Sequence, residues 1–151
     1  MNRKRIQDDF NKLKNSKNIQ IVKCEYINGD ILNWKLAFEG MPSSPYEDGV
    51  FAMHIKLPED YPNSRPFLYF DTKMFHPNIR ESDGLVSLNL LYNWKSARTI
   101  EQAVLGFMEV MENPQTGCGY GEAAQKLLEK DRNKFFEKVE EYTYKYAFDD
   151  V

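Results

Sequence analysis

The chain has 151 residues, of which 42% are hydrophobic, and this length suits one folded domain over residues 1–151. Its 20 basic and 23 acidic residues give a net charge of -3, so neither nucleic acid nor an anionic membrane is an expected partner. The sequence has no apolar run of the ~20 residues that a membrane span needs, and its N-terminus does not resemble a signal peptide. We therefore expect an intracellular protein, cytoplasmic or nuclear, whose partner is another protein or a small ligand.

A helix is the first predicted element, because apolar residues spaced by four and three form one stripe over residues 2–15. Four segments then have the composition or alternation of strands: residues 19–27, 31–38, 50–57 and 67–70. Asn28-Gly29, between the first two, is typical of a tight hairpin. These segments predict a four-stranded antiparallel meander.

The second half of the chain is predicted to be a long loop followed by helices. Residues 74–98 show no sustained periodicity and are expected to form the loop. Thr99 is suited to cap a helix that ends near Asn113-Pro114. A further helical stripe covers residues 122–148, and its pattern neither requires nor excludes a break near Asp131. This order of elements indicates an α+β fold.

Two cysteines, Cys24 and Cys118, lie far apart in the sequence and lack the spacing of a zinc site. In an intracellular protein they are expected to be reduced thiols. No metal and no other cofactor is expected.

Six groups of motifs resemble, in the same order, those of ubiquitin-conjugating enzymes. They are Lys4–Ile6, Ser44–Phe51, Pro58–Pro62, Phe75–Ile79, Trp94 with residues 97–100, and the helical residues from Glu122 to Tyr146. Each motif alone is weak, but together they are specific and cover nearly the whole chain. The resemblance implies the UBC-like α+β fold: an N-terminal helix, a four-stranded antiparallel meander, a long active-site loop and C-terminal helices.

The active-site motif departs from that family at its nucleophile. His76-Pro77-Asn78 is followed by an apolar run over residues 85–91, in which Ser87 stands where the family has the cysteine that carries the modifier as a thioester. An ungapped alignment would place Val86 there instead, and neither register supplies a thiol. A serine hydroxyl is a far weaker nucleophile than a thiolate unless a base activates it.

The resemblance implies roles for other residues near the nucleophile position. His76 is then structural instead of a general base, and Asn78 supports the loop or hydrogen-bonds an oxyanion. The acid that many family members carry in the loop after Met111-Glu112 is replaced by Gly117. Beside it, Cys118 is an alternative thiol, although a cysteine flanked by glycines is as easily a passive loop residue.

Docking surfaces are also implied by the resemblance. The family's ligase-binding loops correspond here to Asn63 and to Ser96-Ala97, although the family usually has an apolar side chain and a proline at the first two positions. The implied partners are ubiquitin or a ubiquitin-like protein, an activating enzyme, and a ubiquitin ligase or a catalytic conjugating enzyme. The first helix begins with three basic residues, Arg3, Lys4 and Arg5, which resemble the docking site for the activating enzyme. The alternative is that they form an ordinary solvated helix face.

Ser87 admits two interpretations. If the serine is native, the protein is a non-catalytic member that binds ubiquitin or a partner conjugating enzyme, which the simultaneous departures at Asn63, Arg65, Ser96 and Gly117 favour. If it is a deliberate Cys→Ser substitution, the natural protein is a genuine ubiquitin-conjugating enzyme, which the complete C-terminal helices favour. A ligand-binding protein without a link to ubiquitin would require all the motif matches to be architectural.

Overall fold

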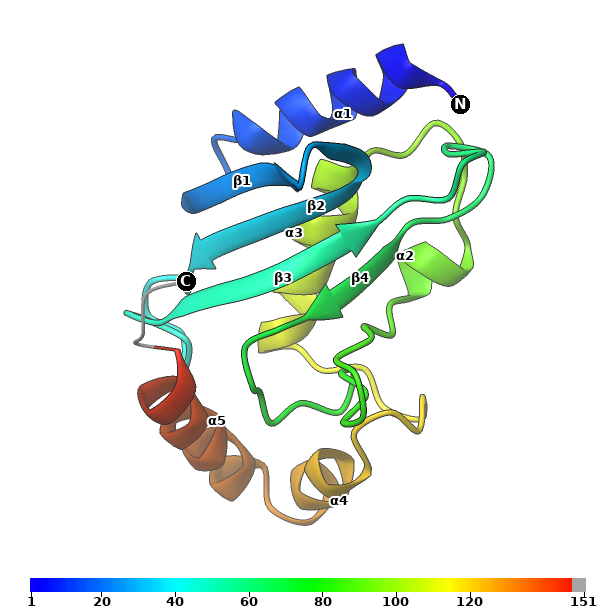
Figure 1. Cartoon of the computed structure of the whole chain (residues 1–151). Coiled ribbons are helices and arrows are strands. Elements are labelled where there is room, and N and C mark those ends of the chain that lie inside the picture. The colour runs from blue at the N-terminus through cyan, green and yellow to red at the C-terminus, as the bar shows by residue number, and fades with distance from the viewer. Residues whose placement is uncertain (148–151) are drawn as a thin grey trace.

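The computed structural model describes residues 1–147, which begin with helix α1 (Arg3–Lys14) and an antiparallel sheet in the order β1-β2-β3-β4. The predicted N-terminal helix and four-stranded meander are confirmed (Figure 1). The strands are β1 (Ile21–Ile27), β2 (Asp30–Glu39), β3 (Val50–Lys56) and β4 (Phe67–Phe70).

The predicted hairpin between β1 and β2 is present at Asn28-Gly29. Both residues have positive φ, 53° at Asn28 and 74° at Gly29. Asparagine and glycine reach this left-handed region at low cost, and the resulting turn matches the twist of the two strands. The local sequence therefore decides where the first strand pair reverses.

Three longer helices form the C-terminal half: α3 (Ile100–Glu112), α4 (Glu122–Lys130) and α5 (Arg132–Tyr146). Thr99 caps α3 as predicted, because its hydroxyl accepts from the Gln102 N–H while the Gln102 side chain accepts from the Thr99 N–H. The helical stripe is broken at Asp131, whose carboxylate accepts from the Lys134 N–H at 3.1 Å and starts α5. The end of the predicted stripe, Phe148, lies outside the described residues.

The predicted loop over residues 74–98 contains one helical turn, α2 (Asn89–Tyr92), so the prediction was wrong at that point. Four residues are too few to show helical periodicity, and the turn is stabilised instead by burial of Leu91. A single β-bridge from Tyr69 to Leu85 joins the loop before α2 to β4, and a second bridge, from Ile79 to Val86, lies within the loop.

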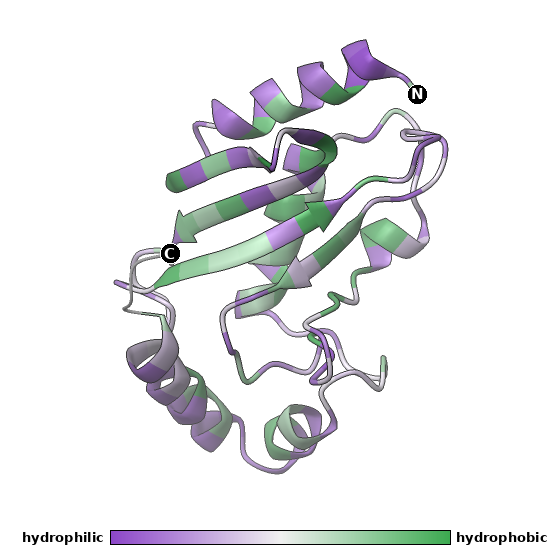
Figure 2. Cartoon of the chain, in the orientation of Figure 1, coloured by the Kyte–Doolittle hydropathy of each residue, from purple (hydrophilic) through white to green (hydrophobic). Residues whose placement is uncertain are grey.

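The core lies between the sheet and α3, with α1 packed beside β1 and β2 (Figure 1). Figure 2 shows apolar and polar residues interspersed along α1, β1 and β2, as half-buried elements require, whereas β3 is apolar over most of its length. Within residues 1–147, no helix is long and apolar enough to cross a membrane, and no cluster of three potential metal ligands is found. Large, fully buried side chains fill the interior: Trp34, Phe38, Phe51, Phe107 and Phe135.

Candidate active site and docking surface

His76 is a buried group whose two ring nitrogens are both hydrogen-bonded. Its Nδ1 accepts from the Asn78 N–H at 3.0 Å, and its Nε2 lies 3.0 Å from the Val110 carbonyl oxygen in α3. Because a carbonyl only accepts, Nε2 carries the proton. Burial lowers the pKa of His76 to about 4, so the ring is neutral at physiological pH. These hydrogen bonds join the His76-Pro77-Asn78 segment, called the HPN motif below, to α3.

Asn78 connects the nucleophile position with the segment that follows α3. Its backbone carbonyl accepts from the Ser87 N–H at 2.8 Å. Its side-chain oxygen accepts from the Gln115 N–H at 2.9 Å, and its amide nitrogen lies 3.7 Å from the Cys118 sulfur. The side chain of Asn78 is therefore directed toward residues 113–121, while its backbone contacts Ser87.

The backbone contacts distinguish Ser87 from Val86. The Val86 N–H donates to the Leu68 carbonyl at 2.9 Å, and the Val86 side chain is part of the core. The next residue, Ser87, pairs with Asn78 and is itself 2% exposed. Ser87 is thus paired with Asn78 of the HPN motif, whereas Val86 is bridged to the following residue, Ile79, and directs its side chain into the core.

The Ser87 hydroxyl contacts the first of two linked tyrosines that sequence reasoning did not identify. It lies 3.2 Å from the Tyr92 hydroxyl, which donates to the Tyr120 hydroxyl at 3.2 Å. Because Tyr92 has a single hydroxyl proton, Ser87 is the donor in its bond to Tyr92. Tyr92 lies in α2, the turn too short to be predicted, so the sequence carried no signal for this contact.

Cys118 lies beside the HPN motif. Its half-buried thiol donates to the Pro77 carbonyl at 3.1 Å. Nearby, the Gly121 N–H donates to the same carbonyl at 3.0 Å, and a Cβ on Gly121 would lie 2.2 Å from the His76 oxygen. Cys24 is also a free thiol, but it is buried, and burial raises its pKa to about 11. Only Cys118 is therefore near the candidate active site.

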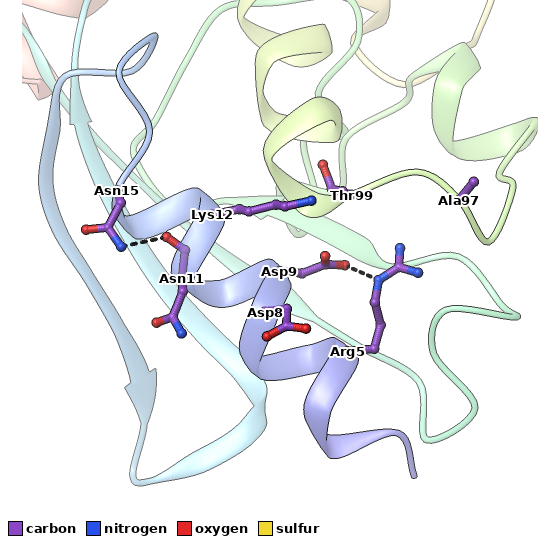
Figure 3. Close-up of a pocket in the computed structure, with 8 residues that line it drawn as sticks. All are labelled: Arg5, Asp8, Asp9, Asn11, Lys12, Asn15, Ala97 and Thr99. Carbon is purple, nitrogen blue, oxygen red and sulfur yellow. Dashed lines mark hydrogen bonds and ion pairs between the residues drawn. The ribbon is translucent and has the colours of Figure 1, made fainter.

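The three basic residues predicted as a docking face lie in different surroundings. Arg5 Nε donates to Asp9 at 2.9 Å, and its guanidinium also donates to the Arg98 carbonyl. Figure 3 shows Arg5 and Asp9 turned toward each other, in a groove between α1 and the residues before α3. Arg3 is exposed, and Lys4 forms an exposed ion pair with Asp8 at 3.3 Å. Arg3 and Lys4 face solvent, whereas Arg5 links α1 to the rest of the molecule.

Asp9, the partner of Arg5, is the centre of a buried cluster. It is 1% exposed and accepts hydrogen bonds from Arg5 and from the Tyr61 hydroxyl. Burial is the main cause that raises the pKa of Tyr61, followed by its bond to Asp9. The Tyr61 hydroxyl therefore stays protonated, and α1 is joined to the loop between β3 and β4.

The two predicted ligase-binding loops lie side by side. The indole N–H of Trp94 donates to the Pro62 carbonyl at 2.8 Å. Asn63 and Ser96 line one groove with the N-terminus of the chain, and Ala97 lines the adjacent groove along α1 (Figure 3). The structure thus brings these three residues to one end of the molecule, next to the start of α1.

Comparison with known proteins now settles the family. A family profile described as "Ubiquitin-conjugating enzyme" matches residues 5–143. This chain belongs to the ubiquitin-conjugating enzyme family. It is 32% identical over 121 residues to "Ubiquitin conjugating enzyme E2 B" of Dictyostelium discoideum, covering 80% of this chain and 82% of that protein. It is also 32% identical over 149 residues to "Ubiquitin-conjugating enzyme E2 ubc-18" of Caenorhabditis elegans, covering 95% and 94% of the two chains.

Solved structures of ubiquitin-conjugating enzymes share the fold. A Toxoplasma gondii E2 domain superposes with a TM-score of 0.84 at 26% identity, covering 96% of this chain and 99% of that one. A putative ubiquitin-conjugating enzyme of Plasmodium yoelii gives a TM-score of 0.86 at 26% identity, covering 97% and 95%. The predicted UBC-like fold and family are therefore confirmed. Members of the family interact with ubiquitin, activating enzymes and ligases in general.

Proposed function

We propose that this member of the ubiquitin-conjugating enzyme family acts in a ubiquitin or ubiquitin-like protein conjugation pathway without forming a thioester at residue 87. It would bind ubiquitin or a partner conjugating enzyme instead. The observation that carries this proposal is the environment of Ser87. Its proton is donated to Tyr92, and among the described residues no contact joins its hydroxyl to a histidine, lysine or carboxylate.

A serine needs such a base to become an effective nucleophile. His76 is occupied at both ring nitrogens by Asn78 and Val110, and its low pKa marks it as a weak base. Tyr92 offers only the oxygen of a neutral phenol. An ester formed at Ser87 would also resist attack by an amine, in contrast to a thioester. The expected result of acylation is a trapped conjugate, without turnover.

A second candidate is a genuine conjugating enzyme that carries a deliberate Cys→Ser substitution at this position. Two observations favour it: the complete pair of helices α4 and α5, and the retained backbone pairing of Ser87 with Asn78. Under this alternative the pocket is intact, and only the sulfur atom is missing.

A charging assay separates the two candidates. This chain and its Ser87→Cys variant are each incubated with activating enzyme, ATP and ubiquitin, and the products are treated with dithiothreitol or hydroxide. We expect no adduct on either protein. An ordinary conjugating enzyme should be charged in the same assay, and replacing ubiquitin by other ubiquitin-like modifiers should also give no adduct on either protein. A dithiothreitol-sensitive adduct on Ser87→Cys alone would favour the second candidate, because the docking face and pocket would then be functional.

Binding is tested separately by titrating the isotope-labelled chain with ubiquitin and with a catalytic conjugating enzyme. Chemical-shift changes confined to one surface would support the proposal, and no binding to either protein would contradict it. We propose that the activating enzyme and ligases use the docking end, which includes Lys4, Asn63, Ser96 and Ala97. An Ala97→Asp substitution is therefore expected to weaken the binding of a ligase more than it weakens the binding of ubiquitin, which would use a different surface.

Cys118 has its own test, because its thiol lies beside Pro77 and Asn78. If it served as the acyl acceptor, the unmodified chain would form a dithiothreitol-sensitive adduct that Cys118→Ser abolishes. We expect no such adduct. An adduct on the unmodified chain that survives Cys118→Ser would exclude this role for Cys118.

A further inference from the structure

We propose that Tyr92 and Tyr120 form a cap that closes the entrance to Ser87, so that a partner or reagent reaches residue 87 only after the cap opens. The contrast in exposure motivates the proposal. Ser87 is 2% exposed, whereas Tyr92, whose hydroxyl contacts it, is 50% exposed. A surface side chain therefore covers a buried one at the position where the family performs its chemistry.

The space enclosed by the two tyrosines is small. A cavity of about 20 Å³ lies between them, Arg65 and the core residues next to Val86, and Ser87 does not line it. A cavity needs about 10–15 Å³ to hold one water molecule. The two tyrosines therefore pack closely against their neighbours, with room for about one water on that side.

The cap is held together by neutral hydroxyl groups and braced by two cations. The bonds from Ser87 to Tyr92 and from Tyr92 to Tyr120 are both 3.2 Å long, which is at the long end for hydroxyl groups. The Arg65 guanidinium lies 5.2 Å from the centre of the Tyr92 ring, and that of Arg80 lies 5.4 Å from the Tyr120 ring. These contacts favour the closed state without locking it, since neutral hydrogen bonds near a surface contribute little each.

Opening at Tyr120 would also release Asn78. Tyr120 belongs to the segment 113–121, in which Gln115 and Cys118 contact the Asn78 side chain. A displacement of this segment therefore removes the partner that holds Tyr92 in place and frees the Asn78 amide together. The two changes are the ones that a reaction at residue 87 would require. The cap is inferred from these contacts alone, so it does not depend on whether residue 87 forms an acyl bond.

Thiol accessibility at residue 87 tests the proposal. The Ser87→Cys variant is treated with iodoacetamide, and modification at residue 87 is followed by peptide mass spectrometry, which distinguishes it from Cys24 and Cys118. We expect slow alkylation, accelerated about tenfold or more when Tyr92→Ala is added, because only the open fraction reacts. Tyr92→Phe and Tyr120→Phe, which keep the ring and remove one hydroxyl, should accelerate it by smaller factors.

Tyr144→Ala is the matched control, because this exposed tyrosine lies on α5 and not at the candidate site. It should leave the rate at residue 87 unchanged, and thermal melts should show that every variant is folded. Alkylation of Ser87→Cys at the rate of an unprotected thiol would overturn the proposal. An equal rate in the Ser87→Cys and Ser87→Cys/Tyr92→Ala proteins, both folded, would overturn it as well.

Discussion

The docking end and the nucleophile end of this molecule are held by different kinds of bond. At the docking end, Arg5 and Tyr61 both donate to the buried carboxylate of Asp9. At the nucleophile end, Ser87 is joined to Tyr92 through neutral hydroxyl groups close to the surface. Hydrogen bonds to a charged group are roughly twice as strong as neutral ones. The comparison indicates that the proposed docking end is firmly held, whereas the hydrogen bonds at Ser87 are individually weaker.

The largest expected effect is that of Asp9→Ala. It removes the shared acceptor and leaves the Tyr61 hydroxyl buried without its partner, and Arg5 without its counter-ion. We expect the free energy of unfolding to fall by about 4 kcal/mol, as for the loss of one partner from a buried pair. Urea denaturation measures it. Asp8→Ala is the matched control, because the Lys4–Asp8 pair is exposed and should contribute less than about 1 kcal/mol. Equal effects of the two substitutions would contradict the strength that is assigned to the buried Asp9 cluster.

Acidification provides the second test, through His76. Its pKa in the folded protein is about 4, below the ordinary value of 6.5, so the unfolded chain binds more protons between these two values. The free energy of unfolding therefore falls as the pH is lowered through this range, by on the order of 3 kcal/mol. The loss should persist in His54→Gln, which removes the other histidine of the chain. An NMR titration in which the His76 ring protonates above pH 6 in the folded protein would contradict this prediction.

Glycine substitutions test how closely the segment after α3 packs against the HPN motif. A Cβ on Gly121 would lie 2.2 Å from the His76 carbonyl oxygen, so Gly121→Ala must displace backbone. We expect a loss of about 2 kcal/mol in the free energy of unfolding, as for other overpacked sites. Gly106→Ala, in α3, meets side chains only at 3.6 Å and should instead stabilise the protein by up to about 1 kcal/mol. A Gly121→Ala protein as stable as the parent would show that this segment is loosely held.

The smallest effect is expected for Tyr92→Phe, which removes the hydroxyl between Ser87 and Tyr120 and keeps the ring. The free energy of unfolding should fall by about 1 kcal/mol, because two neutral hydrogen bonds near the surface are lost. Tyr69→Phe serves as the control, since the described contacts of Tyr69 are made by its ring with His54 and Lys56. A loss as large as that of Asp9→Ala would mean that the nucleophile end is as firmly closed as the docking end.

The elements that sequence patterns predicted correctly are those specified by local chemistry. The Asn28-Gly29 turn and the Thr99 cap each depend on residues within a few positions of one another. The four-residue helix α2 was missed for the same reason, because its stability comes from burying Leu91 and not from a repeating pattern. Family motifs supplied the order of the elements and pointed to His76, Asn78 and Ser87, but not to what those side chains contact.

By itself, the sequence determined the α+β fold, the family, and the serine at the position of the nucleophile. Only the tertiary structure decided that the Tyr61 hydroxyl donates to Asp9 and that Tyr92 meets Tyr120. The physical reason is the range of the interactions. Helix caps, turns and apolar stripes involve neighbours in the chain, whereas these contacts join side chains from separate elements whose approach is fixed only when the core has packed.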